Sequence, residues 1–388
     1  MRTLKDGPRL PSVSPPAGPQ LRRICTARAG GAVAIRYLSH RARWVAAATF
    51  VAVAGVVAAV ALPDGGDGSE GESAARGARW AAQPSSPLER TEVGTARVGR
   101  FIYVVGGFVP DLDTTPQVAR YDIRSRAWTL VAPMPLGVNH AAVAAGGGRC
   151  RGDLYVYGGY TAGGALAGEI DALQRYEPET GTWTTLRGSG IPRAAAALTA
   201  VDCSLYAIGG ASGGTALRTV QIYDIRRDRW RRAASLRVAR EHLASVAIKG
   251  RLLALGGRAG GRNLDVVEEL DPRAGKWLRR PRIPTARSGF GAVAVRGWAV
   301  VVGGEELSPG GETIRPVQAF DPRSGRWRGL PGMLTPRHGL GVVTDGLRVF
   351  ALEGGPQPGA SYSAVNETLQ LPASVLPRRG RFLRTSPG

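Results

Sequence analysis

The chain has 388 residues, which is enough for two ordinary domains or one large repeat fold. Hydrophobic residues make up 43% of it and exclude wholesale disorder, whereas 55 glycines and 27 prolines favour tight turns over long helices. Four histidines and three cysteines exclude a disulfide-dense scaffold. Only three of the 51 basic residues are lysines, a bias typical of a GC-rich bacterial genome.

The N-terminal part predicts a membrane segment behind a basic leader. Residues 1–43 carry nine basic groups against one acidic group, and residues 44–62 contain no charge. A helix of that length spans about 28 Å, close to the ~30 Å hydrocarbon core of a bilayer. Because basic residues stay on the cytoplasmic side, we expect a single-pass signal anchor in the cell membrane that exports the rest of the chain. Secretion after cleavage near Ala61 is the alternative. Residues 63–78 are rich in glycine, serine and acidic residues and predict a flexible linker.

The remaining chain repeats three landmarks with a period of about 50 residues. A Gly-Gly pair ends an apolar run six times. An acidic residue precedes a tryptophan by six residues five times, and an arginine or valine follows each of these tryptophans by ten residues. The pairs begin at Gly106, Gly158, Gly209, Gly256, Gly303 and Gly354, and the tryptophans are Trp128, Trp183, Trp230, Trp277 and Trp327. Three landmarks in phase indicate one structural unit that is repeated along the chain.

These landmarks resemble the kelch repeat, whose units combine an arginine-bearing strand, a strand that ends in Gly-Gly, a Tyr-Asp strand and a tryptophan strand. The resemblance covers residues 79 to about 371 and implies a β-propeller in which each repeat is a four-stranded blade. Short β-branched and aromatic runs, broken by glycine and proline, indicate an all-β array on their own.

The number of blades follows from the two ends of the array. The sixth Gly-Gly pair has no tryptophan after it, while Trp80 stands ten residues before Arg90, in the register of a fourth strand. We therefore predict a six-bladed kelch-type propeller over residues 79–371. The strand around Trp80 should pair with the strand at 367–371, so that the two chain ends share the closing blade and leave no open sheet edge. Residues 372–388 form a basic tail.

The arginine landmark is the main candidate for ligand recognition. It comprises Arg90, Arg193, Arg240, Arg287 and Arg337, with Val138 in the second repeat. The resemblance places it at the start of the innermost strands, on the face with the loops after the second strand. Converging guanidinium groups suit carboxylate, phosphate or sulfate groups, and similar kelch proteins that recruit partners to ubiquitin ligases bind acidic segments in this way. We expect a binding module for an acidic peptide, protein or glycan, with His140, His242 and His338 beside the arginines.

Other interpretations stay open at this stage. The arginines could instead hydrogen-bond neighbouring carbonyl groups or pair with Glu92 and Glu241. A sugar-modifying enzyme similar to the six-bladed sialic-acid mutarotases could use Glu92 or Glu241 as a base beside Arg240, and a structural cell-surface spacer needs no site. Copper oxidases similar to galactose oxidase are disfavoured, because neither Cys150 nor Cys203 is placed on the arginine face to link to a tyrosine. We therefore predict no catalytic residue, no metal site and no cofactor, and leave the oligomeric state open.

Cys150 and Cys203 both precede the second strand of successive repeats. Their hairpin tips should therefore be neighbours on the face opposite the arginines. In an exported protein this arrangement favours a disulfide, with two free thiols as the alternative.

The charge distribution argues against a nucleic-acid partner. The basic leader and the C-terminal tail carry +12 of the net charge of +21, which leaves +9 for the rest of the chain. We therefore expect no nucleic-acid binding.

Overall fold

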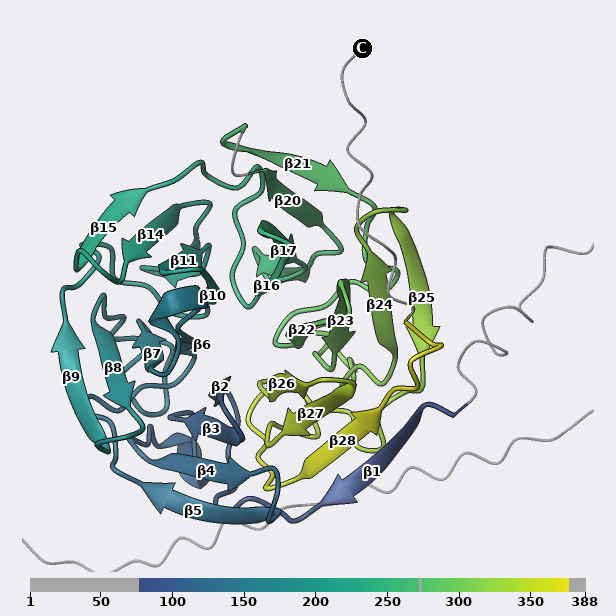
Figure 1. Cartoon of the computed structure of the whole chain (residues 1–388), viewed down its shortest axis with the longest axis horizontal. Coiled ribbons are helices and arrows are strands. Elements are labelled where there is room, and N and C mark those ends of the chain that lie inside the picture. Colours follow the sequence, from purple (N-terminus) through teal and green to yellow (C-terminus); the bar gives the residue numbers. More distant parts are fainter. Residues whose placement is uncertain (1–76, 272–273, 377–388) are drawn as a thin grey trace, which may run out of the picture. The chain divides into compact units, whose positions relative to one another are not determined.

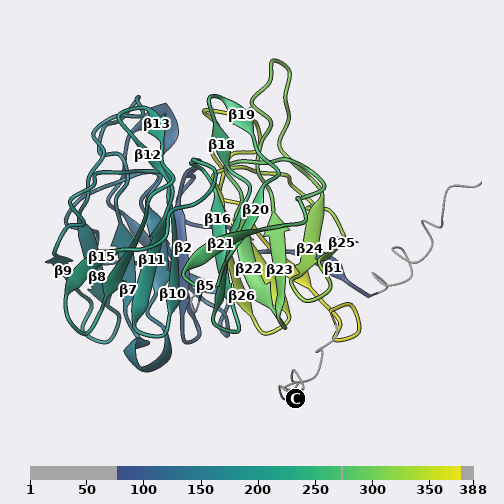
Figure 2. The same ribbon diagram turned by 90° about the horizontal axis from the view of Figure 1, so that it is seen from above.

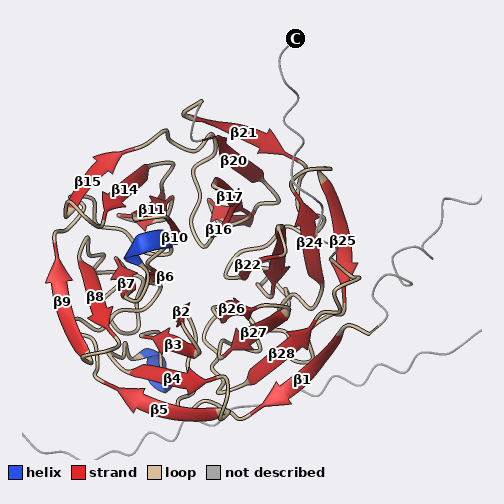
Figure 3. Cartoon of the chain, viewed as in Figure 1, coloured by secondary structure: helices blue, strands red, loops and turns tan. Residues whose placement is uncertain are grey.

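The computed structural model describes residues 77–271 and 274–376, and this part of the chain is built almost entirely of β-strands (Figures 1 and 3). Six four-stranded antiparallel sheets stand as blades around a central axis. Within this part, the helical segments are two short 3-10 turns, η1 (Pro110–Leu112) and η2 (Gly148–Cys150). The six-bladed propeller predicted from the repeats is therefore confirmed.

The blades are numbered in chain order, and the strands of each blade run from the innermost to the outermost. Blade 1 contains β2 (Gly94–Val98), β3 (Phe101–Val105), β4 (Val118–Asp122) and β5 (Ala127–Val131). Blade 2 contains β6 (Ala142–Ala145), β7 (Leu154–Tyr157), β8 (Leu173–Glu177) and β9 (Thr182–Leu186). Blade 3 contains β10 (Ala197–Val201), β11 (Ser204–Ile208), β14 (Val220–Asp224) and β15 (Arg229–Arg232).

The second half of the ring follows the same plan. Blade 4 contains β16 (Ala244–Ile248), β17 (Arg251–Leu255), β20 (Val267–Asp271) and β21 (Lys276–Arg280). Blade 5 contains β22 (Gly291–Val295), β23 (Trp298–Val302), β24 (Val317–Asp321) and β25 (Arg326–Leu330). Blade 6 contains β26 (Gly341–Asp345), β27 (Arg348–Leu352), β28 (Asn366–Gln370) and β1 (Arg79–Gln83). Two small hairpins are added, β12 (Ala211–Ser212) with β13 (Thr215–Ala216) and β18 (Arg258–Ala259) with β19 (Arg262–Asn263).

The core lies between the faces of neighbouring blades. The second strand of each blade is apolar, apart from a polar first residue in β11, β17 and β27, because both faces of the sheet are covered. In β23 every residue is buried. The outermost strands have one exposed face instead, and β5 and β9 alternate between exposed and half-buried residues. Contacts such as the edge-on pair of Tyr103 in blade 1 and Tyr176 in blade 2 fill the space between blades.

Each tryptophan landmark ties its outermost strand to the preceding blade. The indole Nε1 atoms donate to backbone carbonyl oxygens 43–51 residues earlier in the chain, at 2.8–3.2 Å. Trp80 makes the same bond across the chain ends, to the carbonyl of Pro331 at 2.8 Å. Its strand β1 pairs with β28, and Trp80 lies opposite Leu369. The predicted sharing of the closing blade by the two chain ends is therefore confirmed.

The sixth repeat departs by one residue from the register read off the sequence. The first glycine of the five earlier pairs has φ between 53° and 74°, and the residue in this place in blade 6 is Glu353, with φ of 54°. The amide of the second residue in each pair donates to the carbonyl of the arginine landmark in the next blade. In blade 6 this donor is Gly354, 2.8 Å from the carbonyl oxygen of Arg90. The sixth pair is thus Glu353-Gly354, which corrects the pair Gly354-Gly355.

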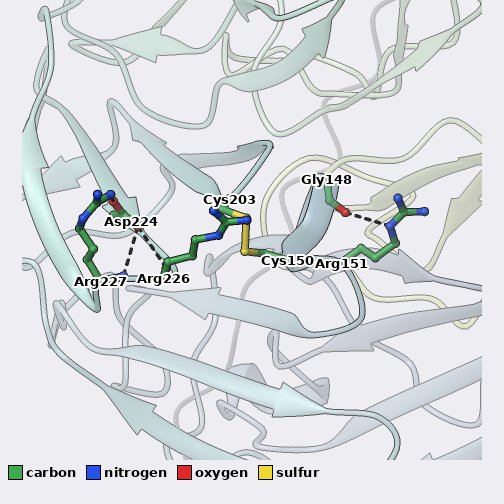
Figure 4. The surroundings of a disulfide bond; sticks show 7 residues. All are labelled: Gly148, Cys150, Arg151, Cys203, Asp224, Arg226 and Arg227. Atoms are coloured by element: carbon green, nitrogen blue, oxygen red, sulfur yellow. Dashed lines mark hydrogen bonds and ion pairs between the residues drawn. A yellow bond between two sulfur atoms is a disulfide. The ribbon is translucent and has the colours of Figure 1, made fainter.

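The two ends of the propeller are built differently (Figure 2). We call the end that carries the loops after the second strands the loop face; these loops are 108–116, 160–170, 211–217, 258–263, 305–313 and 356–364. At the opposite end, the hairpin face, tight turns join consecutive strands. There Cys150 and Cys203 form a disulfide that joins blades 2 and 3, with 5.2 Å between the Cα atoms (Figure 4).

The predicted leader, membrane helix and most of the linker lie outside the described residues, as does most of the predicted tail. Within residues 77–271 and 274–376, no helix has the length and apolar character needed to cross a membrane.

Candidate functional site

The five arginines of the landmark are buried inside the blades rather than presented at the channel mouth. All five are 0% exposed. Each guanidinium group donates to backbone carbonyls of its own blade, as Nη1 of Arg193 does to Gly209 at 2.9 Å and to Thr219 at 3.2 Å. These carbonyls lie where the second and third strands diverge, and a buried acceptor needs a donor. The structure thus corrects the expectation of an electropositive mouth and shows the alternative, in which the arginines bond neighbouring carbonyls.

A polar residue at the second position of the third strand helps to hold four of these guanidinium groups. In blades 3 and 5 it is a glutamine whose Oε1 accepts a hydrogen bond from the arginine. In blades 4 and 6 it is a glutamate, with 3.8 and 3.1 Å between the nearest guanidinium nitrogen and carboxylate oxygen. The pairs are Arg193 with Gln221, Arg287 with Gln318, Arg240 with Glu268 and Arg337 with Glu367.

In blade 1, the side-chain acceptor for the arginine comes from the neighbouring blade. Its third strand has Ala119 in the partner position, and that side chain has no acceptor. Glu353 of blade 6 instead receives the Arg90 guanidinium, with Nε to Oε2 at 2.7 Å and Nη2 to Oε1 at 2.9 Å. This fully buried ion pair explains why glutamate replaces the first glycine of the sixth pair, and it joins the first and last blades.

The residues two positions after the landmark surround the channel, and we call them the channel ring. All six have φ between 51° and 61° and lie in the left-handed region. The amides of five donate to the carbonyl of the member in the preceding blade at 2.8–3.2 Å, and Val93 closes the circle by donating to Gly339. The ring consists of Glu92, His140, Ala195, His242, Gly289 and Gly339, and it lines a cavity of about 100 Å³.

A second set of residues, the mouth ring, lies between the channel ring and the loops. Each member directly follows the Gly-Gly position and forms a β-bridge with the residue that follows the arginine landmark. The mouth ring consists of Phe108, Tyr160, Ala211, Arg258, Glu305 and Gly355. Two of its members, Phe108 and Tyr160, lie edge-on to His140, with ring centroids 5.6 and 5.4 Å apart.

Three histidines converge on one carboxylate in this channel. Nε2 of His140 lies 3.3 Å from Oε2 of Glu92, and Nε2 of His242 lies 4.0 Å from the same atom. Nε2 of His338 lies 3.6 Å from Oε1 of Glu92 and 3.7 Å from Oε2 of Glu305. The chain has four histidines in all. Three of them, from blades 2, 4 and 6, are therefore gathered around Glu92 of blade 1.

Arg258 is the cation of this cluster. Its Nε donates to Oε1 of Glu241 at 2.5 Å, and its Nη1 donates to Oε1 of Glu305 at 3.5 Å. Its Nη2 lies 3.4 Å from Nε2 of His242. Together with Glu92, the cluster thus contains three carboxyl groups, one guanidinium group and three imidazoles.

Burial controls the protonation of the cluster. It raises the pKa of Glu92 to about 8, with Glu305 adding to the rise and Arg258 opposing it. Burial lowers the pKa of His140 to about 3, and the pKa of His242 falls well below its usual value for the same reason, with Arg258 as the next cause in both. The pKa of His338 is also lowered by burial, against the attraction of Glu305. The three imidazoles are therefore uncharged at neutral pH.

Sequence reasoning placed the three histidines near the arginines, and the structure brings the histidines together but not the arginines. Glu92 and Glu241 were identified as neighbours of the landmark. Arg258 and Glu305 were missed, because they were treated as part of variable loops. The signal that finds them is positional: each directly follows a Gly-Gly pair, where the chain is still in register around the channel.

The loop face is acidic although the chain is strongly basic. Its six loops contain six carboxylate side chains and two guanidinium groups. The acidic residues are Asp111, Asp113, Glu169, Glu305, Glu306 and Glu312, and the basic residues are Arg258 and Arg262. Glu92 and Glu241 add two further carboxyl groups below the mouth. Carboxylates therefore outnumber guanidinium groups within these six loops, although the chain as a whole is basic.

The comparisons with known proteins agree with this architecture. Residues 77–267 match the model of the family described as Attractin/LZTR1 beta-propeller. The Kelch-like protein terF of Aspergillus terreus is 33% identical over 34% of this chain and 30% of its own, and Kelch-like protein 25 of Rattus norvegicus is 25% identical over 38% and 33%. The chain thus spans no more than a third of the length of these relatives. The solved structure titled "Structure of YjhT" superimposes with a TM-score of 0.63 over 74% of this chain and 97% of that chain, at 16% identity.

Repeat landmarks, fold and relatives together define the class as a six-bladed β-propeller built of kelch repeats. Within that class, residues 77–267 are similar to the Attractin/LZTR1 propeller family, and 34% of the chain is similar to a kelch-like protein.

Proposed function

We propose that the protein is a binding module that recognises its ligand on the loop face, through a positively charged group that enters the channel mouth. The sequence-based expectation of an acidic ligand depended on exposed arginines, and all five are buried. The proposal therefore keeps the binding role and reverses the charge of the ligand. The observation that carries it is the excess of carboxylates over guanidinium groups in the six loops, because complementary charge steers and orients a partner.

Hydrogen bonds join neighbouring loops at the mouth. Thr114 Oγ1 donates to the carbonyl of Ala162, which joins the first two loops at 3.0 Å. The amide of Gly359 donates to Oε2 of Glu305 at 3.1 Å, which joins the last two. Two leucines at the loop face, Leu166 and Leu307, are 52% and 38% exposed. A rigid rim with exposed apolar side chains and an acidic centre suits a basic peptide or protein segment.

The test uses the full-length chain and two probes, oligolysine and oligoglutamate, with binding followed by fluorescence anisotropy. The double variant Glu306→Lys/Glu312→Lys reverses two exposed charges of the loop face. It should weaken oligolysine binding by about tenfold and reduce its sensitivity to salt. The matched control is Glu179→Lys, an exposed glutamate in the turn between β8 and β9 on the hairpin face, which should leave oligolysine binding unchanged. The basic leader attracts oligoglutamate in every variant, so only the difference between variants is informative. Equal oligolysine binding by the double variant and the wild type would refute the proposal.

An enzymatic function is the second candidate, with Arg258 in place of Arg240. Arg240 is buried in blade 4, whereas Arg258 lies beside both Glu241 and Glu305 in the channel. This arrangement could hold a sugar carboxylate next to a base. Anomerisation of sialic acid that is measurable with the wild type and lost in Glu241→Gln would favour the enzyme over the binding module. A structural spacer predicts that neither set of variants changes any activity.

Our proposal for localisation is a propeller outside the cell, tethered by the predicted membrane segment 44–62. The disulfide between Cys150 and Cys203 supports an oxidising compartment. Labelling of the intact cell surface with a membrane-impermeant reagent tests this proposal, and complete protection of the propeller would contradict it.

A further inference from the structure

We propose that Glu92, His140, His242 and His338 form a binding site for a divalent transition-metal ion such as Zn²⁺ in the channel of the propeller. The inference goes beyond the proposed ligand of the loop face, since it concerns the metal alone. It was not expected from the sequence, because the three histidines are about 100 residues apart along the chain and no short metal-binding motif connects them.

The first argument is the orientation of the three imidazoles. Nδ1 of His140 lies 2.6 Å from Oδ1 of Asn139, Nδ1 of His242 contacts Oε2 of Glu241, and Nδ1 of His338 lies 3.1 Å from the carbonyl oxygen of Gly355. Nδ1 of His140 and of His338 lies at hydrogen-bond distance from an oxygen acceptor, and Nδ1 of His242 contacts a carboxylate oxygen, so a proton on Nδ1 suits all three. The proton is therefore on Nδ1, and Nε2 carries a lone pair. Metal-binding histidines are oriented by this kind of outer hydrogen bond.

The second argument is the shortage of protons between the Nε2 atoms. Three lone pairs face the carboxyl group of Glu92, which can donate one hydrogen bond at most. Arg258 can serve one more, since its Nη2 lies 3.4 Å from Nε2 of His242. Glu92 and Arg258 together therefore supply at most two donors for the three Nε2 lone pairs. A metal ion that accepts all of these lone pairs removes the deficit.

The third argument is size and charge. The donor atoms of Glu92, His140 and His242 all lie within 4.8 Å of one another, and donors in a tetrahedral zinc site are separated by about 3.3 Å. His338 is outside this set of three, with its Nε2 3.6 Å from the other oxygen of Glu92, Oε1. Shifts of less than about 1 Å therefore bring them to bonding distance. The cluster contains three carboxyl groups and one guanidinium group, and a divalent ion that displaces the proton of Glu92 adds only one net positive charge. Imidazole and carboxylate donors suit zinc and its first-row neighbours.

The experiment measures Zn²⁺ binding to the full-length chain, purified without a polyhistidine tag, by competition with a chromophoric chelator. The wild type should bind one equivalent. Glu92→Gln and His140→Asn should each bind Zn²⁺ at least about tenfold more weakly; asparagine is chosen because it tolerates the positive φ at position 140. The matched controls are His40→Asn, which removes the remaining histidine, and Glu306→Gln on the loop face, and both should bind as the wild type does.

A second readout separates loss of the site from loss of the fold. Zn²⁺ should raise the Tm of the wild type and of both controls but not the Tm of Glu92→Gln or His140→Asn, while all metal-free forms show the same β-rich circular dichroism. A wild type that takes up no Zn²⁺, or Glu92→Gln and His140→Asn variants that bind it undiminished, would overturn the inference. Neither result bears on the binding of oligolysine to the loop face, so the two proposals fail separately.

Discussion

The loop face and the hairpin face of this propeller handle charge in opposite ways. On the loop side, charged side chains are buried in the blades and the channel. Each of them needs a hydrogen-bonding or oppositely charged partner, as the Arg90–Glu353 pair shows. On the hairpin face, the charge of Arg227 is exposed to solvent and pairs with the half-buried Asp224 near the disulfide (Figure 4). Buried charges specify geometry because leaving one unpaired is costly, whereas solvated charges contribute little. The side on which charge is buried is therefore the side where the structure fixes a site.

The largest expected effect comes from the buried ion pair between the first and last blades. Glu353→Ala leaves the Arg90 guanidinium without its carboxylate and should lower the free energy of unfolding by about 3–5 kcal/mol, measured by urea denaturation. Glu353→Gln should cost less, about 1–2 kcal/mol, because blades 3 and 5 hold their arginines with Gln221 and Gln318.

The control for this prediction is Glu179→Ala on the hairpin face, where the side chain is exposed. It should leave the urea midpoint unchanged. Equal stability of Glu353→Ala and Glu179→Ala would mean that a buried charge on the loop side contributes no more to stability than an exposed charge on the hairpin face.

An intermediate effect is expected for the disulfide of the hairpin face. The double variant Cys150→Ser/Cys203→Ser opens a link across 53 residues and should lose about 2–4 kcal/mol of stability. Wild-type protein treated with reductant should show the same urea midpoint as the double variant. A midpoint that neither the substitutions nor the reductant changes would show that blades 2 and 3 are held by packing alone.

The smallest effect is expected for the exposed ion pair beside the disulfide. Nη1 of Arg227 lies 2.8 Å from Oδ2 of Asp224, and the Arg227 side chain is 66% exposed. Arg227→Ala should therefore leave the melting temperature unchanged in both low and high salt. A clear loss of stability at low salt would show that this face also depends on its charges.

The fold could be predicted from the sequence because its landmarks are local. The interval between Trp80 and Arg90 was sufficient to identify β1 as the fourth strand of the last blade. The strand at Trp80 precedes the first complete blade, and the last repeat is the one that lacks a fourth strand. The site could not be predicted in the same way. Whether Arg193 faces the channel or its own blade depends on carbonyls of two diverging strands and on Gln221, a polar residue between the apolar residues Val220 and Ile222. That signal is visible in the sequence but has meaning only in the folded blade.

The channel cluster shows a second reason for the limit. His140, His242 and His338 do not occupy the same repeat position: the first two belong to the channel ring, and His338 is one residue earlier. Their meeting point depends on the left-handed backbone at Glu92, His140 and His242, which a strand pattern does not predict. The repeat position of a residue determines that it lies around the channel, and the local backbone conformation determines which of these side chains come into contact.

The pairing of β1 with β28 also determines how the ring responds to force. In this antiparallel pair Arg79, the entry to β1, lies opposite Gln370, the exit from β28. A pull on the two chain ends therefore loads one end of the strand pair and breaks its backbone bonds one after another, like a zipper, instead of shearing them all at once. Tension along the chain would separate β1 from β28 first and break the hydrogen bond from Trp80 to Pro331. The propeller would therefore open in blade 6 while the other five blades stay intact.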